Sequence, residues 1–256
     1  MRVVKIGGRA QGDARLTPSL MAAWNESPGA LCVVHGGGDE LSQMQRALGR
    51  EATFVGGRRV TSVADLELLR MVLSGVVNKR IVNALVAAGL PAVGLSGEDS
   101  GLIRAEEIDR STLGFAGRPT SVNSDLLHTL MKAGYLPVIS PVGYDATRSE
   151  VGGVLNVNGD DAAAAIAAAL GADELLLVAD VEGVRDGKGK IVPSLTEDAA
   201  RDLIVSGVAN AGMAAKLESA QVAVSAGVRC VRICDLEGIS ESERGTSITQ
   251  SQSIAL

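Results

Sequence analysis

A lysine interrupts the apolar run that opens the chain. In VVKIGG, the apolar residues predict a short buried strand, and Gly7-Gly8 predicts the turn that ends it. Burying the ammonium group of Lys5 is costly unless a partner of opposite charge lies close to it. The pattern alone leaves two interpretations open: Lys5 points to water, or it is held near an anionic group.

A histidine and three glycines, His35 to Gly38, follow the apolar run LCVV. Consecutive glycines let the backbone approach a ligand closely, and amide groups ahead of a helix form an anion-binding concavity. Three glycines exceed what a tight strand–helix turn needs, so the motif favours anion binding. A general-base role for His35 stays open beside the capping or orienting role that we favour.

Two later clusters carry charge at predicted helix starts. NVNGDD precedes an alanine-rich helix, and Asp160 or Asp161 could simply cap that helix. Lys216 lies near the start of another helix, in AGMAAK, where a solvated surface lysine is the ordinary interpretation. The chain has neither a GxxxxGK[ST] phosphate loop nor the HRD and DFG motifs, so any use of ATP requires another architecture.

The elements that position these clusters alternate along the chain. Short apolar runs (RVVKI, LCVVH, PAVGL, LPVIS, ELLLVA and RCVRIC) are separated mostly by longer helical patterns, which predicts a parallel sheet covered on both faces. Ligands bind at the carboxyl ends of such strands, where the four clusters lie. Residues 101–120 are polar and glycine-rich, which predicts a hairpin or lid, and residues 143–159 are expected to separate two lobes.

Composition narrows the class of protein. The chain has 256 residues and a formal net charge of −6, which argues against a general nucleic-acid or acidic-membrane surface. The longest apolar run, AAAAIAAAL, is too short to span a bilayer, and no signal-peptide pattern opens the chain. Three cysteines in apolar runs indicate reduced core thiols, and we expect a cytoplasmic protein with no metal site of its own.

Taken in order, seven motifs resemble those of the amino-acid kinase family: VKIGG, VVHGGG, FVGGRRVT, SGVVNKRIV, GYLPVISPVG, NVNGDDAAAAIAAALGADELLLVADVEGV and AGMAAKLESA. Each motif alone is weak, but the ordered set covers nearly the whole chain. The resemblance implies a three-layer α/β/α sandwich on a mostly parallel sheet. It also implies a single kinase domain over 1–256, with an acceptor-binding lobe at 1–150 and an ATP-binding lobe at 151–256.

The resemblance also implies roles for particular residues. Lys5 and Lys216 would stabilise the transferring phosphoryl group from opposite sides, and Asp160 would orient both lysines. The remaining predicted roles are amide donors at Gly8, Gly36 and Gly37, acceptor contacts at Arg59 and Asn156, and nucleotide contacts at Asp180, Gly183, Lys188, Gly212 and Met213. The sequence departs from the family's pattern in places, among them Gly56 in place of asparagine, Gly159 in place of alanine, and two small residues in GMAAK where bulkier ones are usual.

The reaction implied by the resemblance is phosphorylation of the side-chain carboxylate of N-acetyl-L-glutamate by ATP, a step of arginine biosynthesis. The products are an acyl phosphate and ADP. A carboxylate with a pKa of about 4 is already ionised at pH 7, so the reaction needs no general base. Phosphoryl transfer depends mainly on positioning and charge neutralisation, and Mg²⁺ would be held mainly by the nucleotide phosphates.

Two other functions stay open. A kinase of the same family could act on 2-aminoadipate or glutamate linked to an acidic carrier protein, which would favour a basic rim formed by Arg58, Arg59, Lys79 and Arg80. A non-catalytic regulator could bind ATP or an amino acid through the same fold. Retention of Lys5, Asp160 and Lys216 together argues against the regulator.

A homodimer that arginine does not inhibit is the expected assembly. In this family, arginine-regulated hexamers resemble one another in an N-terminal helix ahead of the first strand, and here the first predicted strand begins at Arg2. The predicted helix DLELLRMVLSGVVNKRIVNAL is rich in apolar residues beyond what one face buries. Those expected to form the dimer contact are Leu66, Leu68, Leu69, Val72 and Leu73.

Overall fold

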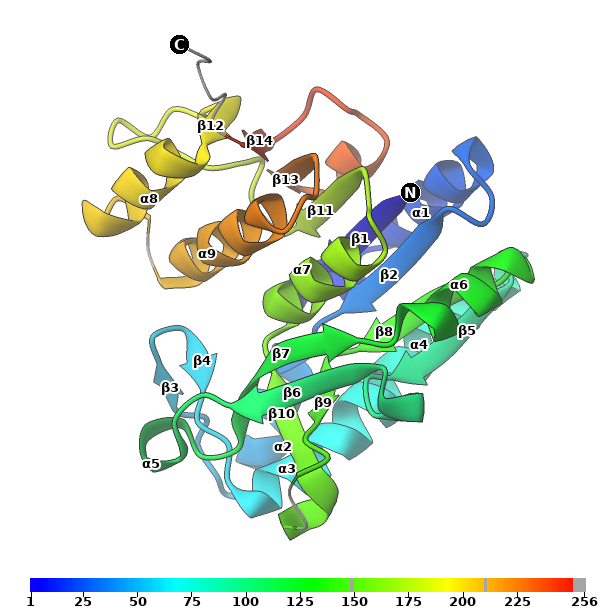
Figure 1. The fold of residues 1–256 in the computed structure, drawn as a ribbon, viewed down its shortest axis with the longest axis vertical. Coiled ribbons are helices and arrows are strands. Elements are labelled where there is room, and N and C mark those ends of the chain that lie inside the picture. Colours follow the sequence, from blue (N-terminus) through cyan, green and yellow to red (C-terminus); the bar gives the residue numbers. More distant parts are fainter. Residues whose placement is uncertain (148–149, 210, 251–256) are drawn as a thin grey trace.

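The first strand of the chain lies near the middle of an eight-stranded sheet (Figure 1). The computed structural model describes residues 1–147, 150–209 and 211–250. Within them the strand order is β12-β14-β13-β11-β1-β2-β8-β5, and every neighbouring pair is parallel except β13 and β14. The predicted mostly parallel sheet is confirmed.

The strands of this sheet are short and largely buried. They are β1 (Arg2–Ile6), β2 (Leu31–His35), β5 (Ala92–Ser96), β8 (Leu136–Ser140), β11 (Glu174–Val178), β12 (Ser194–Thr196), β13 (Cys230–Cys234) and β14 (Thr246–Thr249). Burial raises the pKa of the Cys32 and Cys234 thiols to about 12, so both are protonated at neutral pH. The structure contains no disulfide at these positions, and all three cysteines are free thiols.

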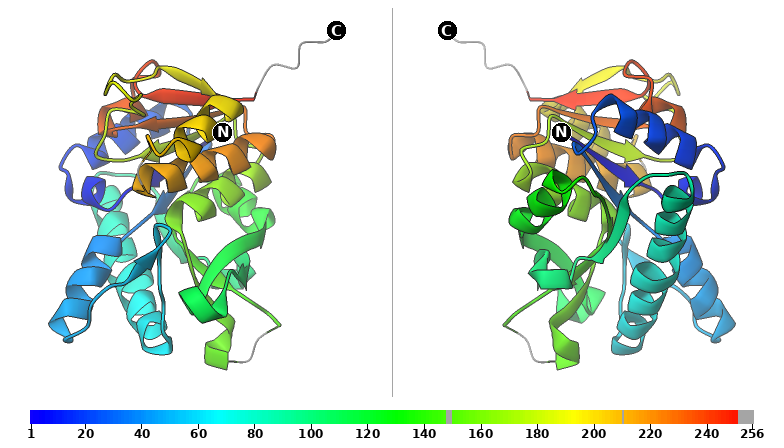
Figure 2. Two further views of the ribbon diagram at one scale, coloured as in Figure 1. Left: turned by 90° about the vertical axis from the view of Figure 1, so that its left-hand side faces the viewer. Right: turned by 90° about the vertical axis from the view of Figure 1, so that its right-hand side faces the viewer.

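Helices cover both faces of the sheet, which completes the predicted three-layer sandwich (Figure 2). On one face lie α1 (Leu16–Glu26) and α4 (Asn78–Ala87). On the other lie α6 (Ser124–Lys132), α7 (Gly159–Ala169) and α9 (Ala211–Ser225), with α8 (Glu197–Val205) packed on α9. Because both faces are covered, the strands are apolar along their length rather than alternating.

A smaller sheet lies beside the carboxyl end of the main one. Its strands are β6 (Ile103–Glu107), β7 (Ala116–Val122), β9 (Val142–Tyr144) and β10 (Val154–Val157), which close on themselves, with α5 (Arg110–Leu113) between β6 and β7. The antiparallel pairing of β6 with β7 confirms the hairpin predicted at 101–120. Strand β10 pairs with β7 and β9, although it follows the lobe boundary expected at residue 150; that boundary remains a prediction.

One long helical stretch corrects the expected dimer contact. Helix α3 (Val63–Leu69) continues through a π-helical segment (Arg70–Val77) into α4, and α2 (Gly38–Ala47) packs beside it. The five residues expected to face a second chain are at most 5% exposed, because they contact α2, β5, β9 and β10 of their own chain. The larger exposed apolar side chains of this stretch are Val63, Met71, Val76 and Val86.

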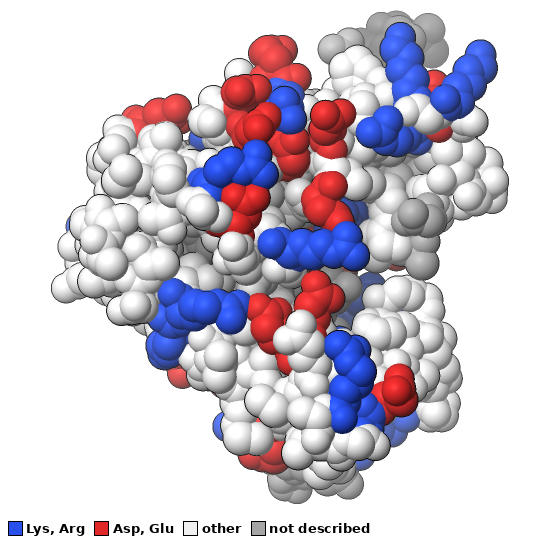
Figure 3. Space-filling model, turned by 180° about the vertical axis from the view of Figure 1, so that it is seen from behind, with Lys and Arg blue, Asp and Glu red and all other residues white. Residues whose placement is uncertain are grey.

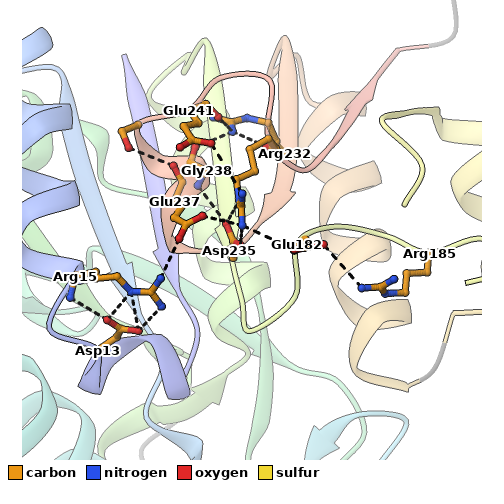
Figure 4. A network of polar contacts seen from close by, with 11 residues as sticks. Asp13, Arg15, Glu182, Arg185, Arg232, Asp235, Glu237, Gly238 and Glu241 are labelled. Carbon is orange, nitrogen blue, oxygen red and sulfur yellow. Dashed lines mark hydrogen bonds and ion pairs between the residues drawn. The ribbon is translucent and has the colours of Figure 1, made fainter. Parts of the chain in front are cut away.

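A network of ion pairs fixes the loop that follows β13 (Figure 4). Arg15, just before α1, contacts Glu237 at 3.1 Å, and Arg244 contacts Asp235 and Glu237. Arg232 is 2% exposed and donates hydrogen bonds to the carbonyls of Gly238, Glu241 and Arg244. These contacts join the loop after β13 to the start of α1 and to Arg244, which precedes β14.

Candidate active site

The predicted site residues lie at the edge of the sheet where β1, β2 and β11 end. The chain leaves β1 through α1 to reach β2, whereas β11, on the other side of β1, is reached through α7 on the opposite face. Such a reversal of direction opens a crevice at the carboxyl ends of the strands. The turns of VKIGG, VVHGGG and LLLVAD, together with the start of α7, therefore converge on one place.

A carboxylate held between two lysines occupies the centre of this crevice. Asp160 Oδ1 lies 2.9 Å from Lys5 Nζ, and Asp160 Oδ2 lies 3.0 Å from Lys216 Nζ. Lys5 and Asp160 are 7% and 5% exposed. The structure therefore brings together β1, α7 and α9 through their charged groups. The solvated interpretation of Lys5 is wrong, because its ammonium group lies beside a buried anion.

The charge states of this cluster follow from burial and proximity. Burial alone would raise the pKa of Asp160, but the positive charges of Lys5 and Lys216 outweigh it and hold that pKa below its usual range. Burial lowers the pKa of Lys5, with Asp160 opposing and Lys216 adding to that shift. The carboxylate is ionised at neutral pH and leaves the cluster with excess positive charge, which suits a phosphoryl group.

The start of α7 is shaped to bring Asp160 against Lys5. The Asn158 side chain caps the helix by accepting a hydrogen bond from the Asp160 amide at 2.8 Å. A Cβ atom at Gly159 would lie 3.1 Å from Lys5 Cε, which is tighter than ordinary contact. Glycine at this position therefore gives the Lys5 side chain room beside the first turn of the helix.

The glycines of HGGG differ in their structural roles. Gly37 has a φ of +148°, and a Cβ there would lie 2.3 Å from Leu73 Cδ2, so the position requires glycine. The Gly36 amide donates to the Ile6 carbonyl at 3.0 Å and extends the β1–β2 ladder. The predicted role of Gly36 as an amide donor to a ligand would require this bond to open, whereas among the described residues the Gly8 and Gly37 amides have no such partner.

His35 lies behind these glycines and is completely buried. Its Nδ1 lies 2.7 Å from the Gly36 carbonyl oxygen and its Nε2 lies 3.1 Å from Asn78 Nδ2. Burial lowers the pKa of His35 to about 4, so the ring is neutral. The orienting role favoured from the sequence fits this geometry, and Asn78 is a partner that sequence reasoning missed.

A small cavity of about 150 Å³ opens beside HGGG. Its walls combine apolar side chains of the π-helical stretch with polar groups of the small sheet and the β3–β4 hairpin, formed by β3 (Phe54–Val55) and β4 (Arg58–Arg59). Its lining residues include Gly36, Gly37, Arg58, Arg59, Leu73 and Asn156. The predicted acceptor residues thus line one cavity.

The guanidinium group of Arg59 is already engaged within the protein. Its Nη1 donates to Gln45 Oε1 at 2.6 Å, and its Nη2 donates to Gly38 O and Ser42 Oγ, both at 2.8 Å. A two-pronged contact through Nη2 to a ligand carboxylate would therefore require one of these bonds to open. Asn156 Nδ2 donates to Thr61 Oγ1 at 2.8 Å, which leaves its side-chain oxygen for a ligand.

The turn of the β3–β4 hairpin explains the glycine at position 56. Gly56 and Gly57 have φ angles of +56° and +76°. Two consecutive positive φ angles define the tight hairpin turn that Asn-Gly and Gly-Gly both adopt. The departure at Gly56 therefore preserves the turn.

Two larger cavities, of about 300 and 470 Å³, lie on the other side of the lysine pair. Lys216 and Asp180 line both, and Arg9 reaches across the smaller one to pair with Asp180. Gly212 and Met213 line the larger one, as expected for nucleotide contacts. Gly183 and Lys188 do not line either cavity: Gly183 packs against Thr246, and Lys188 is exposed in a turn closed by Asp186.

The four cations expected to form a basic rim do not gather. Arg58 pairs with Asp161, and Arg59 is 8% exposed. Lys79 and Arg80 lie on α4, where Lys79 bonds to Asn78 and Gly94 and Arg80 pairs with Glu40. On the face seen in Figure 3, basic and acidic side chains are interspersed.

Two further properties concern the described parts of the chain only, a metal site and a membrane-spanning helix. There, no group of three or more His, Cys, Asp or Glu side chains is placed to hold a metal ion. None of the helices in these parts combines the length and the apolar character needed to cross a bilayer.

A sheet of this topology, with paired lysines at its switch point and cavities of unequal size on either side, defines a phosphotransferase. The chain belongs to the amino acid kinase family, whose model matches residues 1–235. The acetylglutamate kinase of Roseiflexus castenholzii is 44% identical over 246 residues, 93% of this chain and 91% of that protein. That of Dinoroseobacter shibae is 43% identical over 239 residues, 91% of this chain and 80% of that protein.

A solved structure agrees with the fold over the full length. The crystal structure of smu.665 from Streptococcus mutans UA159 is 30% identical, has a TM-score of 0.87 and covers 98% of each chain. The three-layer fold class inferred from the sequence is confirmed, and the chain is a kinase.

Proposed function

We propose that the chain transfers the γ-phosphoryl group of ATP to the side-chain carboxylate of N-acetyl-L-glutamate, in arginine biosynthesis in the cytoplasm. The carrying observation is the buried Lys5–Asp160–Lys216 cluster, which lies between a small cavity and two larger ones. The names of relatives 43–44% identical to the chain support this acceptor. Arg58 and Arg80, which were expected to form a basic rim, are paired with acidic side chains, and this favours N-acetylglutamate over an acceptor linked to an acidic carrier protein.

Each residue of the site has a proposed role in phosphoryl transfer that follows from its position. Lys5 and Lys216 face the transferring phosphoryl group and neutralise charge that grows on its oxygens in the transition state. Asp160 holds the two ammonium groups in place and limits their mutual repulsion. The acceptor lies in the 150 Å³ cavity against Arg59 and Asn156, with its carboxylate directed at the Gly37 amide.

The nucleotide binds in the two larger cavities, beside Asp180, Gly212 and Met213. Mg²⁺ accompanies ATP and neutralises charge on its β- and γ-phosphates. The Gly8 amide, at the end of β1, lies with Lys5 and Lys216 along the smaller of these cavities and can donate to a phosphate oxygen.

Trapping the acyl phosphate tests the proposed function. The purified chain is incubated with ATP, Mg²⁺, hydroxylamine and one acceptor at a time, and the hydroxamate is measured. N-acetylglutamate should give a hydroxamate at a rate far above glutamate, aspartate and carrier-linked aminoadipate. Faster reaction with the carrier-linked acceptor would replace the proposed substrate, and no hydroxamate with any acceptor would favour a non-catalytic regulator.

A further inference from the structure

Two consecutive aspartates at the start of α7 each link α9 to another element of the molecule. Asp160 contacts Lys5 on β1 and Lys216 on α9, as described above. Asp161 contacts Arg58 on β4, and its Oδ1 accepts a hydrogen bond from Ser219 Oγ on α9 at 2.7 Å. The second aspartate therefore also bridges to α9, but from the hairpin rather than from β1.

The Arg58 end of this second bridge lies in the hairpin that closes the acceptor cavity. Phe54, Gly57, Arg58 and Arg59 of the hairpin all line that cavity, and Gly57 also lines the larger nucleotide-side cavity. The first strand of the hairpin is open to solvent, because Phe54 and Val55 are 54% and 43% exposed. The second strand is held on one side by the hydrogen bonds of Arg59 to Gln45, Gly38 and Ser42. The ion pair of Arg58 ties the same strand to α7.

The Ser219 end lies on the helix that carries a catalytic lysine. Lys216 and Ser219 are three residues apart on α9, so their side chains project from neighbouring turns of one face. The side chains of Arg58 and Asp161 are 26% and 16% exposed, and Ser219 is 2% exposed. Partly buried charges interact more strongly than the screened pairs of an open surface.

We propose that Arg58, Asp161 and Ser219 form a latch that holds the hairpin over the acceptor cavity and links it to α9, so that the acceptor and the nucleotide favour each other's binding. The three are positioning residues, since they act through the hairpin and through Lys216. This inference deepens the proposed function and rests on it for the identity of the acceptor. The latch itself does not depend on the identity of the acceptor, because it is defined by the contacts of Asp161 with Arg58 and Ser219.

Limited trypsin digestion tests the latch without any substrate. Trypsin cleaves after Arg59, and cleavage requires the hairpin to leave its place, so its rate follows the open population. Asp161→Asn should speed hairpin cleavage about tenfold, measured by mass spectrometry, because the neutral amide loses the ion pair. Arg229→Leu is the matched control: Arg229 is 81% exposed, its pair with Asp173 is remote from the hairpin, and this variant should be cleaved there like the parent.

Coupling between the two ligands is the second readout. The dissociation constant of N-acetylglutamate is measured by calorimetry with and without a saturating non-hydrolysable ATP analogue. In the parent the analogue should tighten acceptor binding several-fold. Arg58→Leu and Asp161→Asn should each bring that factor close to one, the double variant should lose no more than either, and Arg58→Lys should restore most of it.

The outcomes separate the latch from the function. Hairpin cleavage at the parent's rate in Asp161→Asn, an unchanged coupling factor in Arg58→Leu, or additive losses in the double variant would each overturn the latch. A parent that makes no hydroxamate from N-acetylglutamate would overturn the function, while faster hairpin cleavage in Asp161→Asn would still support the latch.

Discussion

At the scale of single residues, the central feature of the site is a buried cluster with two lysine side chains and one aspartate. Asp160 neutralises one of its two lysines, so one positive charge stays uncompensated until a phosphoryl group arrives. Burial makes that charge more effective than it would be in water. In the proposed reaction, this positive charge stabilises the transferring phosphoryl group most strongly where charge grows on its oxygens in the transition state.

Lys5→Ala tests this argument. Turnover should fall by about 10²–10³-fold, the size of effect seen when one preorganised donor to a transition state is lost. Binding of ADP should change little, because Lys216, Gly212 and the Asp180 side of the cavity remain. Steady-state kinetics and calorimetry measure the two quantities. Near-normal turnover in a folded variant would remove Lys5 from the reaction.

His35 gives the molecule a predicted dependence of stability on pH. Its pKa is about 4 in the folded state against an ordinary 6.5, because burial disfavours the charged ring. Between those values the unfolded chain binds a proton that the folded chain does not, so stability falls as pH drops from 6.5 to 4. The loss is on the order of 3 kcal/mol.

Urea denaturation across this pH range measures the effect. His35→Gln should be less stable than the parent at pH 7 and should lack most of the slope between pH 6.5 and 4. The other histidine, His128 on α6, supplies the control, since His128→Gln should keep the parent's slope. An equal slope in His35→Gln and the parent would assign the pH dependence to other groups.

At the scale of elements, the two-glycine turn of the β3–β4 hairpin should govern acceptor affinity. Gly56→Asn should leave the KM for the acceptor nearly unchanged, because asparagine tolerates a positive φ. Gly56→Val should raise that KM roughly 5–30-fold, since a β-branched residue in this conformation costs about 1–2 kcal/mol. Initial-rate kinetics compare the two variants, and equal KM values would separate the hairpin from acceptor binding.

Local patterns in the sequence predict the main helices and strands well, but they predict poorly which distant side chains contact one another. Lys5, Asp160 and Lys216 fall in motifs whose order identifies them. Nothing near Asp161 indicates partners at positions 58 and 219, because those contacts depend on how distant elements pack. The bond of the Gly36 amide within the sheet was also not evident from the sequence, because the β1–β2 ladder continues one residue past the predicted strand end.

At the scale of the whole molecule, we still expect a homodimer, through a surface different from the one that the sequence indicated. Met71 and Val76 of the π-helical segment are 60% and 57% exposed, so this segment presents two large apolar side chains that a second chain could cover. Met71→Glu should convert a sedimenting dimer into a monomer. Val205→Glu, at an 81% exposed site on α8, should leave the assembly unchanged. A monomeric parent would contradict the prediction.

The central place of β1 has a consequence for how the chain is made. Its partner β2 follows closely, but its other partner β11 pairs Glu174 with Arg2, 172 positions away. At about 5–20 residues per second, a ribosome needs roughly 10–30 s to deliver that strand. During this interval one edge of β1 is unpaired and Lys5 lacks its counter-charge, so the emerging chain exposes to aggregation the strand that carries the proposed catalytic lysine.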